Sequence, residues 1–113
     1  QSVGQPVIIP GSMGTASYIL VGSQSALDLT FGSTAHGAGR VMSRTKALKM
    51  FTSREINNQL KQKKIYIRSH SRKGLVEEAP QVYKNVDEVI KVSHNVGIGQ
   101  KVARMVPIGV LKG

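Results

Sequence analysis

The sequence predicts an α+β fold in which short strands alternate with a few helices. Short apolar runs bounded by Pro and Gly, at 7–9 and 17–21, have the length and composition of strands. Residues that favour helix starts, Ser43, Thr52 and Asn85, each precede a stretch with helical periodicity. With 113 residues, of which 40% are hydrophobic and only 4% aromatic, the chain can build one largely aliphatic core.

The first part of the chain predicts two strands and little else that is regular. Strands are expected at 7–9 and 17–21, and the residues 10–15 between them form a tight loop. Residues 22–41 are rich in Gly, Ser and Thr, and they predict at most a turn of helix around 26–29.

The central part of the chain predicts two successive helices. Ser43 is a suitable N-cap for a helix over 44–51. Thr52 and Glu55 have the spacing of a capping box, in which each side chain binds a free backbone amide of the other residue. The second helix then ends in a run of lysines, which suits the negative end of its dipole.

The last part of the chain predicts strands on both sides of a third helix. A short strand is expected at 65–67. Asn85, with a glutamate three residues later, repeats the capping pattern for a helix that reaches about His94 and is stopped by Gly97. The apolar stretch 102–111 contains Pro and Gly and predicts one or two further strands.

The positive charge is concentrated in one stretch of the chain. The formal net charge is +10, yet residues 1–39 contain no Lys or Arg and one acid. Residues 40–73 contain eleven basic residues and one acid, whereas residues 74–113 contain five basic residues and four acids. Such a block attracts polyanions, most often nucleic acid, although a solvated basic face is the alternative.

The motif with the clearest chemical potential is the run from His36 to Arg40. Gly37 and Gly39 let backbone amides approach phosphate oxygens, and Arg40 can supply a forked, permanently charged contact. A neutral imidazole can act as a nucleophile towards phosphorus. The alternative for His36 is a structural histidine in a glycine-rich turn.

Other well-known sites are absent from the sequence. There is no Walker loop and no Gly-x-Ser-x-Gly nucleophile elbow, and Met42 stands where a dinucleotide-binding motif needs its third glycine. The chain has no cysteine, which excludes disulfides and thiolate metal sites. His70 and His94 have no paired spacing with His36, so both are expected at the surface and no metal site is expected in this chain.

A second loop with several hydroxyl groups spans residues 10–17. Its free amides and its Ser and Thr side chains suit a nucleotide, although an ordinary turn uses the same residue types. This pattern alone therefore leaves the role of the loop open.

Three segments, taken together, resemble the RtcB family of RNA-splicing ligases. They are the motif from Pro10 to Tyr18, the motif from His36 to Arg44, and the ending from Ala103 to Gly113. The resemblance covers essentially the whole chain. It implies that 1–113 is a single segment, the C-terminal part of a larger RtcB-like fold. Within it lie a Gly-rich nucleotide-pocket half (1–42), a basic helical region (43–73) and a C-terminal region (74–113).

The resemblance also implies an activity. Family members use GTP and Mn²⁺ to join RNA 2′,3′-cyclic phosphate or 3′-phosphate ends to 5′-hydroxyl ends. His36 would be the nucleophile that carries GMP, and Arg40 and Arg44 would contact RNA phosphates. The remaining GTP-binding residues implied by the motifs are Pro10, Gly11, Ser12, Met13, Ser17, Gly37, Ala38, Gly39, Tyr83 and Lys112.

Several further expectations follow from the resemblance. The partners would be RNA, such as tRNA halves or broken RNA, and the remainder of the ligase chain, in the cytoplasm and without a membrane. The Mn²⁺ ligands would lie outside this segment, so the segment alone would be inactive. The missing initiator Met agrees with a piece of a larger protein. Other classes of function stay open at this point: a small basic RNA-binding module without catalysis, or a purely structural fragment.

Two expectations concern how individual side chains are held. The apolar stretch 106–111 is expected to be buried in the core and thereby to fix Lys112 at the mouth of the nucleotide pocket. If Arg44 is structural rather than a phosphate contact, its expected partner is an acid such as Asp87 or Glu88.

Overall fold

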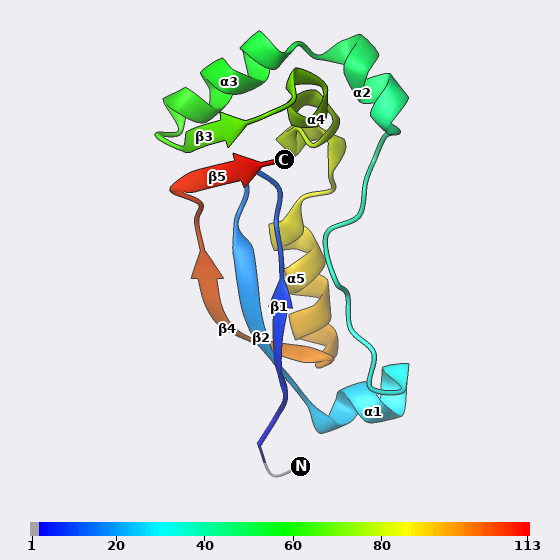
Figure 1. Cartoon of the computed structure of the whole chain (residues 1–113). Coiled ribbons are helices and arrows are strands. Elements are labelled where there is room, and N and C mark those ends of the chain that lie inside the picture. Colours follow the sequence, from blue (N-terminus) through cyan, green and yellow to red (C-terminus); the bar gives the residue numbers. More distant parts are fainter. Residues whose placement is uncertain (1–2) are drawn as a thin grey trace. The chain divides into compact units, whose positions relative to one another are not determined.

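The computed structural model describes residues 3–113, and these form two compact units. Unit 1 comprises the residues up to Gly11, Ala16–Ala38 and Asn85–Met105, and unit 2 comprises Ser12–Thr15, Gly39–Lys84 and Val106–Gly113. The described part contains five α-helices, one short 3₁₀ helix and five strands (Figure 1). The predicted α+β class is therefore confirmed. Within residues 3–113, no helix has the length and hydropathy that crossing a membrane would need.

Unit 1 is a three-stranded antiparallel sheet with two helices. The strands are β1 (Pro6–Ile9), β2 (Ser17–Gly22) and β4 (Gly99–Met105), in the order β1-β2-β4. Helix α1 (Gln24–Thr30) follows β2, and α5 (Val86–Val96) precedes β4. Figure 1 shows α5 lying along the sheet.

The core of unit 1 forms where α5 packs on one face of this sheet. Alternate residues of β2 point to this face, as a strand's twofold side-chain repeat requires. Burial of such aliphatic side chains contributes roughly 1.5–3 kcal/mol each. The buried residues of this core are Ile9, Ala16, Tyr18, Leu20, Val86 and Ile90.

A polar network connects the three elements β2, α5 and β4. The Tyr18 hydroxyl donates to Asp87, and the Arg104 Nε–H donates to Asp87 Oδ1 at 3.0 Å. The hydrogen bond from Arg104 lowers the pKa of the Asp87 carboxyl most, and the hydrogen bond from Tyr18 lowers it further. Burial, and then the hydrogen bond to Asp87, raise the pKa of the Tyr18 phenol. Asp87 therefore links residues that are far apart in the sequence.

Replacing Asp87 with asparagine is expected to reduce stability at neutral pH more than in acid. Because the pKa of Asp87 is lowered from its ordinary 3.8, its contribution is complete above about pH 4 and is lost as pH falls through the lowered value. Since the Asp87 and Arg104 side chains are 44% and 50% exposed, a loss of only about 0.2–1 kcal/mol is expected at pH 7. Urea unfolding of the full-length protein at pH 7 and pH 2.5 measures the difference. The control is Asp28→Asn, which replaces an exposed acid on α1. If Asp87→Asn lowers the free energy of unfolding equally at both pH values, the expectation is wrong.

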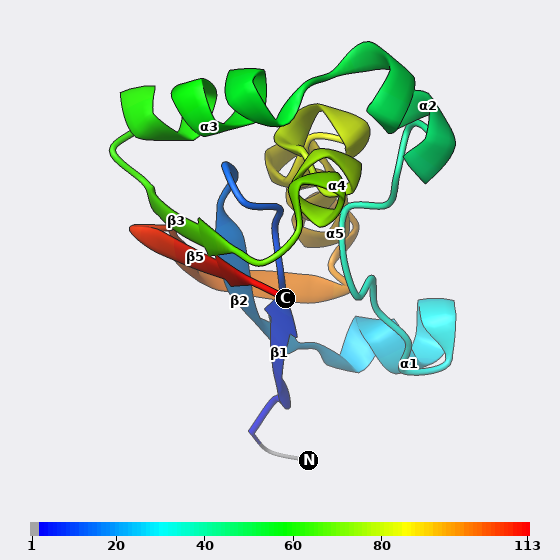
Figure 2. The ribbon, with the colours of Figure 1, turned by 45° about the horizontal axis from the view of Figure 1, so that its top comes forward.

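Unit 2 combines three helices with a two-stranded parallel sheet. Its elements are α2 (Arg44–Met50), α3 (Ser53–Gln62), β3 (Tyr66–Ser69), α4 (Arg72–Glu77), the 3₁₀ helix Pro80–Val82 and β5 (Gly109–Lys112). Strand β5 pairs with β3, so the end of the chain lies beside a segment about forty residues earlier (Figure 2). The core residues of this unit are Met13, Ala47, Ile56, Leu60, Ile65, Leu75, Ala79 and Val82.

The predicted helix starts are confirmed. The Ser43 side chain accepts the amide of Lys46 at 3.1 Å and begins α2. Thr52 and Glu55 form the capping box of α3: the Glu55 carboxylate accepts the amide of Thr52 at 2.7 Å, and the Thr52 hydroxyl accepts the amide of Glu55 at 3.3 Å. Asn85 caps α5, but its side chain accepts from the amide two residues on, that of Asp87.

The chain end differs from the sequence-based expectation. Residues Val106, Ile108 and Leu111 are exposed, and only Val110 packs against the core of unit 2. The expected burial of 106–111 is therefore wrong. The physical reason is that side chains alternate between the two faces of β5 and only the face with Val110 packs against the core of unit 2, so the other face stays exposed. Helix α4 was also not predicted, because its six residues show little apolar periodicity.

Candidate functional site

The residues predicted to bind the nucleotide are divided between the two units. In unit 1, His36 lies in an irregular segment after α1 and its side chain is exposed. Ala38 packs against the core of unit 1 and anchors this segment. At Gly37, a side chain would meet only the carbonyl oxygen of Pro10, at 4.0 Å. The packing of unit 1 therefore does not require glycine at this position.

The loop 10–17, which carries several hydroxyl groups, begins in unit 1. Pro10 is exposed, and the amide of Gly11 donates to Ser17 Oγ at 3.0 Å. This hydrogen bond joins the end of β1 to the start of β2 across the loop. Ser17 therefore braces the loop as well as being a candidate ligand contact.

In unit 2, the centre of the loop is held by its own hydroxyl groups. The Ser12 amide donates to Thr15 Oγ1 at 2.8 Å, and the Thr15 amide donates to the Ser12 carbonyl at 3.2 Å. The Met13 side chain is buried in the core of unit 2, so only its backbone groups can face a ligand. A side chain at Gly14 would approach Pro80 to 2.8 Å, so this glycine allows the loop to pack closely.

The backbone after His36 enters unit 2 at Gly39. Its φ of +78° is a conformation that glycine adopts without strain, and no atom lies within 4 Å of where a side chain would begin. The Gly39 carbonyl accepts the amide of Lys84 at 2.9 Å, and Arg40 forms an antiparallel bridge with Tyr83. This short ladder places two predicted site residues, Arg40 and Tyr83, next to each other.

Glu78 connects three predicted site residues of unit 2. Its carboxylate pairs with Arg40 Nη1 at 3.4 Å and with Arg44 Nε at 3.6 Å, and it accepts a hydrogen bond from the Tyr83 hydroxyl. The Arg40 guanidinium also lies over the Tyr83 ring, 5.1 Å from its centroid. Burial, and then Glu78, raise the pKa of the Tyr83 phenol. The expected pairing of Arg44 with Asp87 or Glu88 is wrong, since its partner is Glu78.

The two arginines differ in how many donors remain free. Arg40 donates from Nε to the Met42 carbonyl at 3.1 Å and from Nη2 to the Glu77 carbonyl at 2.7 Å, in addition to its contacts with Glu78 and Tyr83. Its side chain is 23% exposed, whereas that of Arg44 is 64% exposed. Of the two, Arg44 is therefore better placed to contact a phosphate.

Lys112 lies in β5, opposite Ser69 of β3. Its carbonyl accepts the amide of His70 at 3.1 Å, and its side chain is half-buried on the same face of the strand as Val110. Lys112 is therefore held in position by strand pairing and not by the burial of 106–111.

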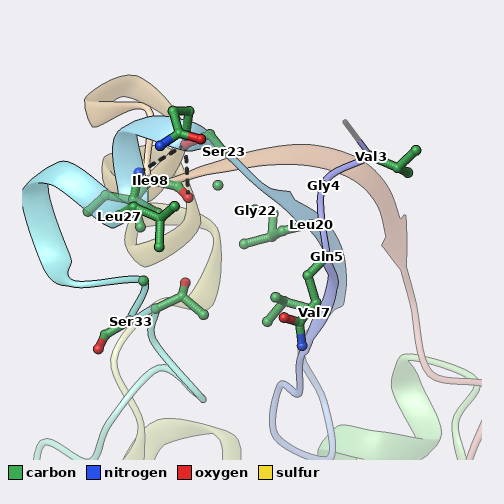
Figure 3. A pocket seen from close by; sticks show the side chains of 15 residues that line it. Val3, Gly4, Gln5, Val7, Leu20, Gly22, Ser23, Leu27, Ser33 and Ile98 are labelled. Atoms are coloured by element: carbon green, nitrogen blue, oxygen red, sulfur yellow. Dashed lines mark hydrogen bonds between the residues drawn. The ribbon is translucent and has the colours of Figure 1, made fainter. Parts of the chain in front are cut away.

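Neither a metal cluster nor the cavity of unit 1 adds further candidate residues. Within residues 3–113, no group of three or more metal-ligating side chains is found. Unit 1 contains a cavity of about 570 Å³ between the start of β1 and the segment after α1 (Figure 3). No titratable side chain and none of the predicted site residues lines it.

Sequence reasoning missed Glu78. The signal available was an adjacent acid pair, residues 77 and 78, directly after a strongly basic stretch. His70 and His94 were both expected at the surface, and the structure confirms this only for His70. His70 is exposed, whereas His94 is half-buried and its Nδ1 accepts the amide of Lys101 at 3.2 Å.

Comparison with known proteins supplies the family. The profile described as tRNA-splicing ligase RtcB matches residues 1–113. Proteins named tRNA-splicing ligase RtcB are 53% identical in Nanoarchaeum equitans, over 97% of this chain and 23% of the relative. The relative from Methanococcus maripaludis is 51% identical, over 99% of this chain and 23% of the relative. The relative from Pyrococcus horikoshii is 56% identical, over 100% of this chain and 13% of the relative. The chain thus spans between about an eighth and a quarter of the length of these relatives and matches their C-terminal part. Over its whole length, the chain belongs to the RtcB family of tRNA-splicing ligases.

Proposed function

We propose that this chain supplies the nucleophile and part of the GTP site of an RNA ligase. The ligase joins RNA 2′,3′-cyclic phosphate or 3′-phosphate ends to 5′-hydroxyl ends, acts on tRNA halves or broken RNA in the cytoplasm, and uses Mn²⁺ bound by other residues. One observation carries the proposal: in a chain of the RtcB family, His36 is exposed and is followed by Gly37, where a side chain would meet only the Pro10 carbonyl oxygen.

GTP is a substrate in the proposed first step. A nitrogen of the His36 imidazole attacks the α-phosphorus, a P–N bond forms, and the bond from that phosphorus to the bridging oxygen breaks. Pyrophosphate leaves, and the imidazole loses its ring proton to solvent or to a base. Open backbone at Gly37 and Gly39 suits this chemistry, because amides there can donate to phosphate oxygens without interference from side chains.

The other proposed GTP contacts are those implied by the family motifs, and the geometry within each unit is compatible with them. In unit 1, the exposed Pro10 and the braced Gly11–Ser17 pair form one wall beside Gly37. In unit 2, Ser12, Met13 and Gly39 contribute backbone groups, Tyr83 stacks on guanine with the exposed part of its ring, and Lys112 binds the base. Ala38 contributes its backbone, since its side chain packs against the core of unit 1.

In the proposed second stage, the joining of the RNA ends, Arg44 binds an RNA phosphate. Arg40 donates its remaining N–H to a phosphate oxygen. The functional test is ligation by the full-length protein with Mn²⁺ and GTP. Two labelled RNAs, one ending in a 2′,3′-cyclic phosphate and one beginning with a 5′-hydroxyl, should give a joined product. A 5′-phosphate acceptor is the matched control. Absence of the joined product in the folded protein would overturn the proposed function.

Glu78→Gln is expected to slow ligation without weakening RNA binding. The substitution removes the charge that positions Arg44 and Arg40, and it also removes a negative charge that opposes RNA. A rate loss of about tenfold is expected, which corresponds to about 1.4 kcal/mol, with an unchanged or tighter RNA Kd. The pKa of Tyr83 should also fall towards its ordinary value, which tyrosinate absorbance against pH measures. Glu88→Gln, an exposed acid of α5, is the control, and equal effects of both variants on the rate would show that Glu78 does not position the arginines.

A further inference from the structure

A groove in unit 2 runs between α3 and β3 and contains none of the residues assigned above. Its main cavity has a volume of about 650 Å³. The polar and aromatic residues that line it are Ser53, Arg54, Asn57, Asn58 and Lys61 of α3, Tyr66 of β3 and Arg72 of α4. A neighbouring cavity of about 400 Å³ shares Asn57, Ile67 and Arg72 and adds Arg68 and His70. We call these two connected cavities the α3–β3 groove; Figure 2 shows α3 and β3 side by side.

The polar wall of the groove follows from the phase of α3. Residues 54, 57, 58 and 61 recur at intervals of three and four, so they form one stripe along the helix. Ile56 and Leu60 lie on another stripe and are buried in the core of unit 2. The Thr52–Glu55 capping box fixes where α3 begins. Packing and capping together therefore hold the polar stripe towards the groove.

The charge of the groove is entirely positive. Arg54, Lys61 and Arg72 line the main cavity, Arg68 lines the neighbouring one, and no acidic residue lines either cavity. Within residues 3–113, none of these cations has an ion-pair partner within 4 Å. By contrast, Arg40, Arg44 and Arg104 are each paired with a carboxylate. The α3–β3 groove thus offers uncompensated positive charge in a concave surface, where the potential is strongest.

An exposed aromatic ring favours RNA over an acidic peptide as the occupant. Tyr66 lines the groove and is 73% exposed, whereas Ile56 and Leu60 of α3 are buried and Ile67 of β3 is partly buried. An exposed tyrosine beside phosphate-binding cations is the arrangement that stacks unpaired bases. Asn57 donates to the Ser53 carbonyl at 2.9 Å, which leaves its own carbonyl oxygen free for a base edge. An acidic peptide would be bound through the cations, whereas an unpaired RNA accounts for both the cations and the ring.

We infer that the α3–β3 groove is an RNA subsite, in which Arg54, Lys61 and Arg72 bind the backbone of an unpaired RNA stretch and Tyr66 stacks on one of its bases. The inference rests on the proposed function in that RNA is the ligase substrate. It adds a place on the protein that holds the RNA through residues separate from those assigned to GTP and to the phosphate at Arg44.

The experiment measures binding of a labelled uridine 12-mer to the full-length protein by fluorescence anisotropy, at several salt concentrations. The triple variant Arg54→Gln, Lys61→Gln, Arg72→Gln should weaken binding at least tenfold and reduce the slope of log affinity against log salt by about 2, since about 0.7 is lost per phosphate contact of a single strand. The matched control is Lys46→Gln, Lys49→Gln, Lys84→Gln. It removes three exposed lysines of unit 2 that lie outside the groove, and a smaller change in slope is expected.

Tyr66 provides an independent arm that does not depend on the triple variant being folded. Tyr66→Ser should weaken RNA binding about five- to a hundredfold, the equivalent of about 1–3 kcal/mol of base stacking, without changing the salt slope. Tyr66→Phe should keep most of the affinity. Because the side chain is exposed, neither change should alter thermal unfolding.

The outcomes separate this inference from the proposed function. Formation of the GMP adduct from GTP, without RNA, tests the proposed function alone, and the groove variants should leave it unchanged. If the groove triple and the control triple lower affinity and slope equally, or if Tyr66→Ser and Tyr66→Phe bind RNA like the unaltered protein, the groove is not an RNA subsite. If the groove triple loses binding to a polyglutamate peptide while keeping its RNA affinity, the occupant is an acidic protein and the inference is overturned.

Discussion

Replacing His36 with alanine is expected to abolish formation of the covalent GMP adduct while leaving the protein folded. In the proposed step the imidazole nitrogen forms the bond to phosphorus, and no neighbouring side chain can substitute for a missing nucleophile. The folded state should persist because His36 is exposed and unit 1 buries Ala38, not His36, in this segment. Intact-mass spectrometry after incubation with GTP and Mn²⁺ measures the adduct, which should be labile in acid as a phosphoramidate is.

The matched control for His36 is another exposed histidine of the same chain. His70→Ala should form the adduct as the unaltered protein does, since His70 is exposed and belongs to neither nucleotide motif. His94 is a poorer control because its Nδ1 accepts the amide of Lys101. An adduct retained by folded His36→Ala would remove His36 from the role of nucleophile and would direct the search to other residues of the protein.

Lys112→Met is expected to weaken GTP binding by roughly ten- to a hundredfold. The strand pairing of β5 with β3 fixes the backbone of Lys112, so only its side chain has to be ordered when the ammonium donates to the guanine oxygen. A charge-assisted hydrogen bond of this kind contributes about 1.5–3 kcal/mol, which corresponds to that range of affinity. ATP binding should change much less, because adenine has an amino group in place of that oxygen.

Affinities for GTP and ATP, measured by calorimetry on the same full-length protein, test the role of Lys112. Lys91→Met, which removes an exposed lysine of α5, should change neither. Equal losses for GTP and ATP in Lys112→Met would mean that Lys112 contacts phosphate or supports the fold. A loss confined to GTP would assign Lys112 to selection of the base.

Features that depend on a few neighbouring residues were readable from the sequence. The Ser43 cap and the Thr52–Glu55 capping box were predicted and are present, since each joins groups only three residues apart. The strands β1 and β2 also lie close to the predicted apolar runs. The family could be recognised for a related reason: its two glycine-rich motifs are continuous in the chain and need no tertiary structure to be seen.

The sequence predicted the candidate site only in part. The sequence nominated Arg40, Arg44 and Tyr83 separately, but it gave no indication that Glu78 holds all three. An ion pair is chosen by distance in the folded state, and several acids near this basic stretch were equally plausible partners. Glu78 is the partner because it follows α4 and the segments 39–41 and 82–84 pair with each other in unit 2. Asp87 pairs instead with Arg104 in unit 1.

By itself, then, the sequence determined most of the local elements, the family and the motif that contains the proposed nucleophile, since each of these is written in contiguous residues. Only the tertiary structure decided which strands pair. β2 pairs with β4 across about eighty residues and β5 lies parallel to β3. It also decided that the apolar end of the chain stays largely exposed, with Lys112 positioned by backbone hydrogen bonds. The physical reason is that strand pairing and ion pairing depend on which surfaces the folded backbone brings together, and local propensity does not specify this.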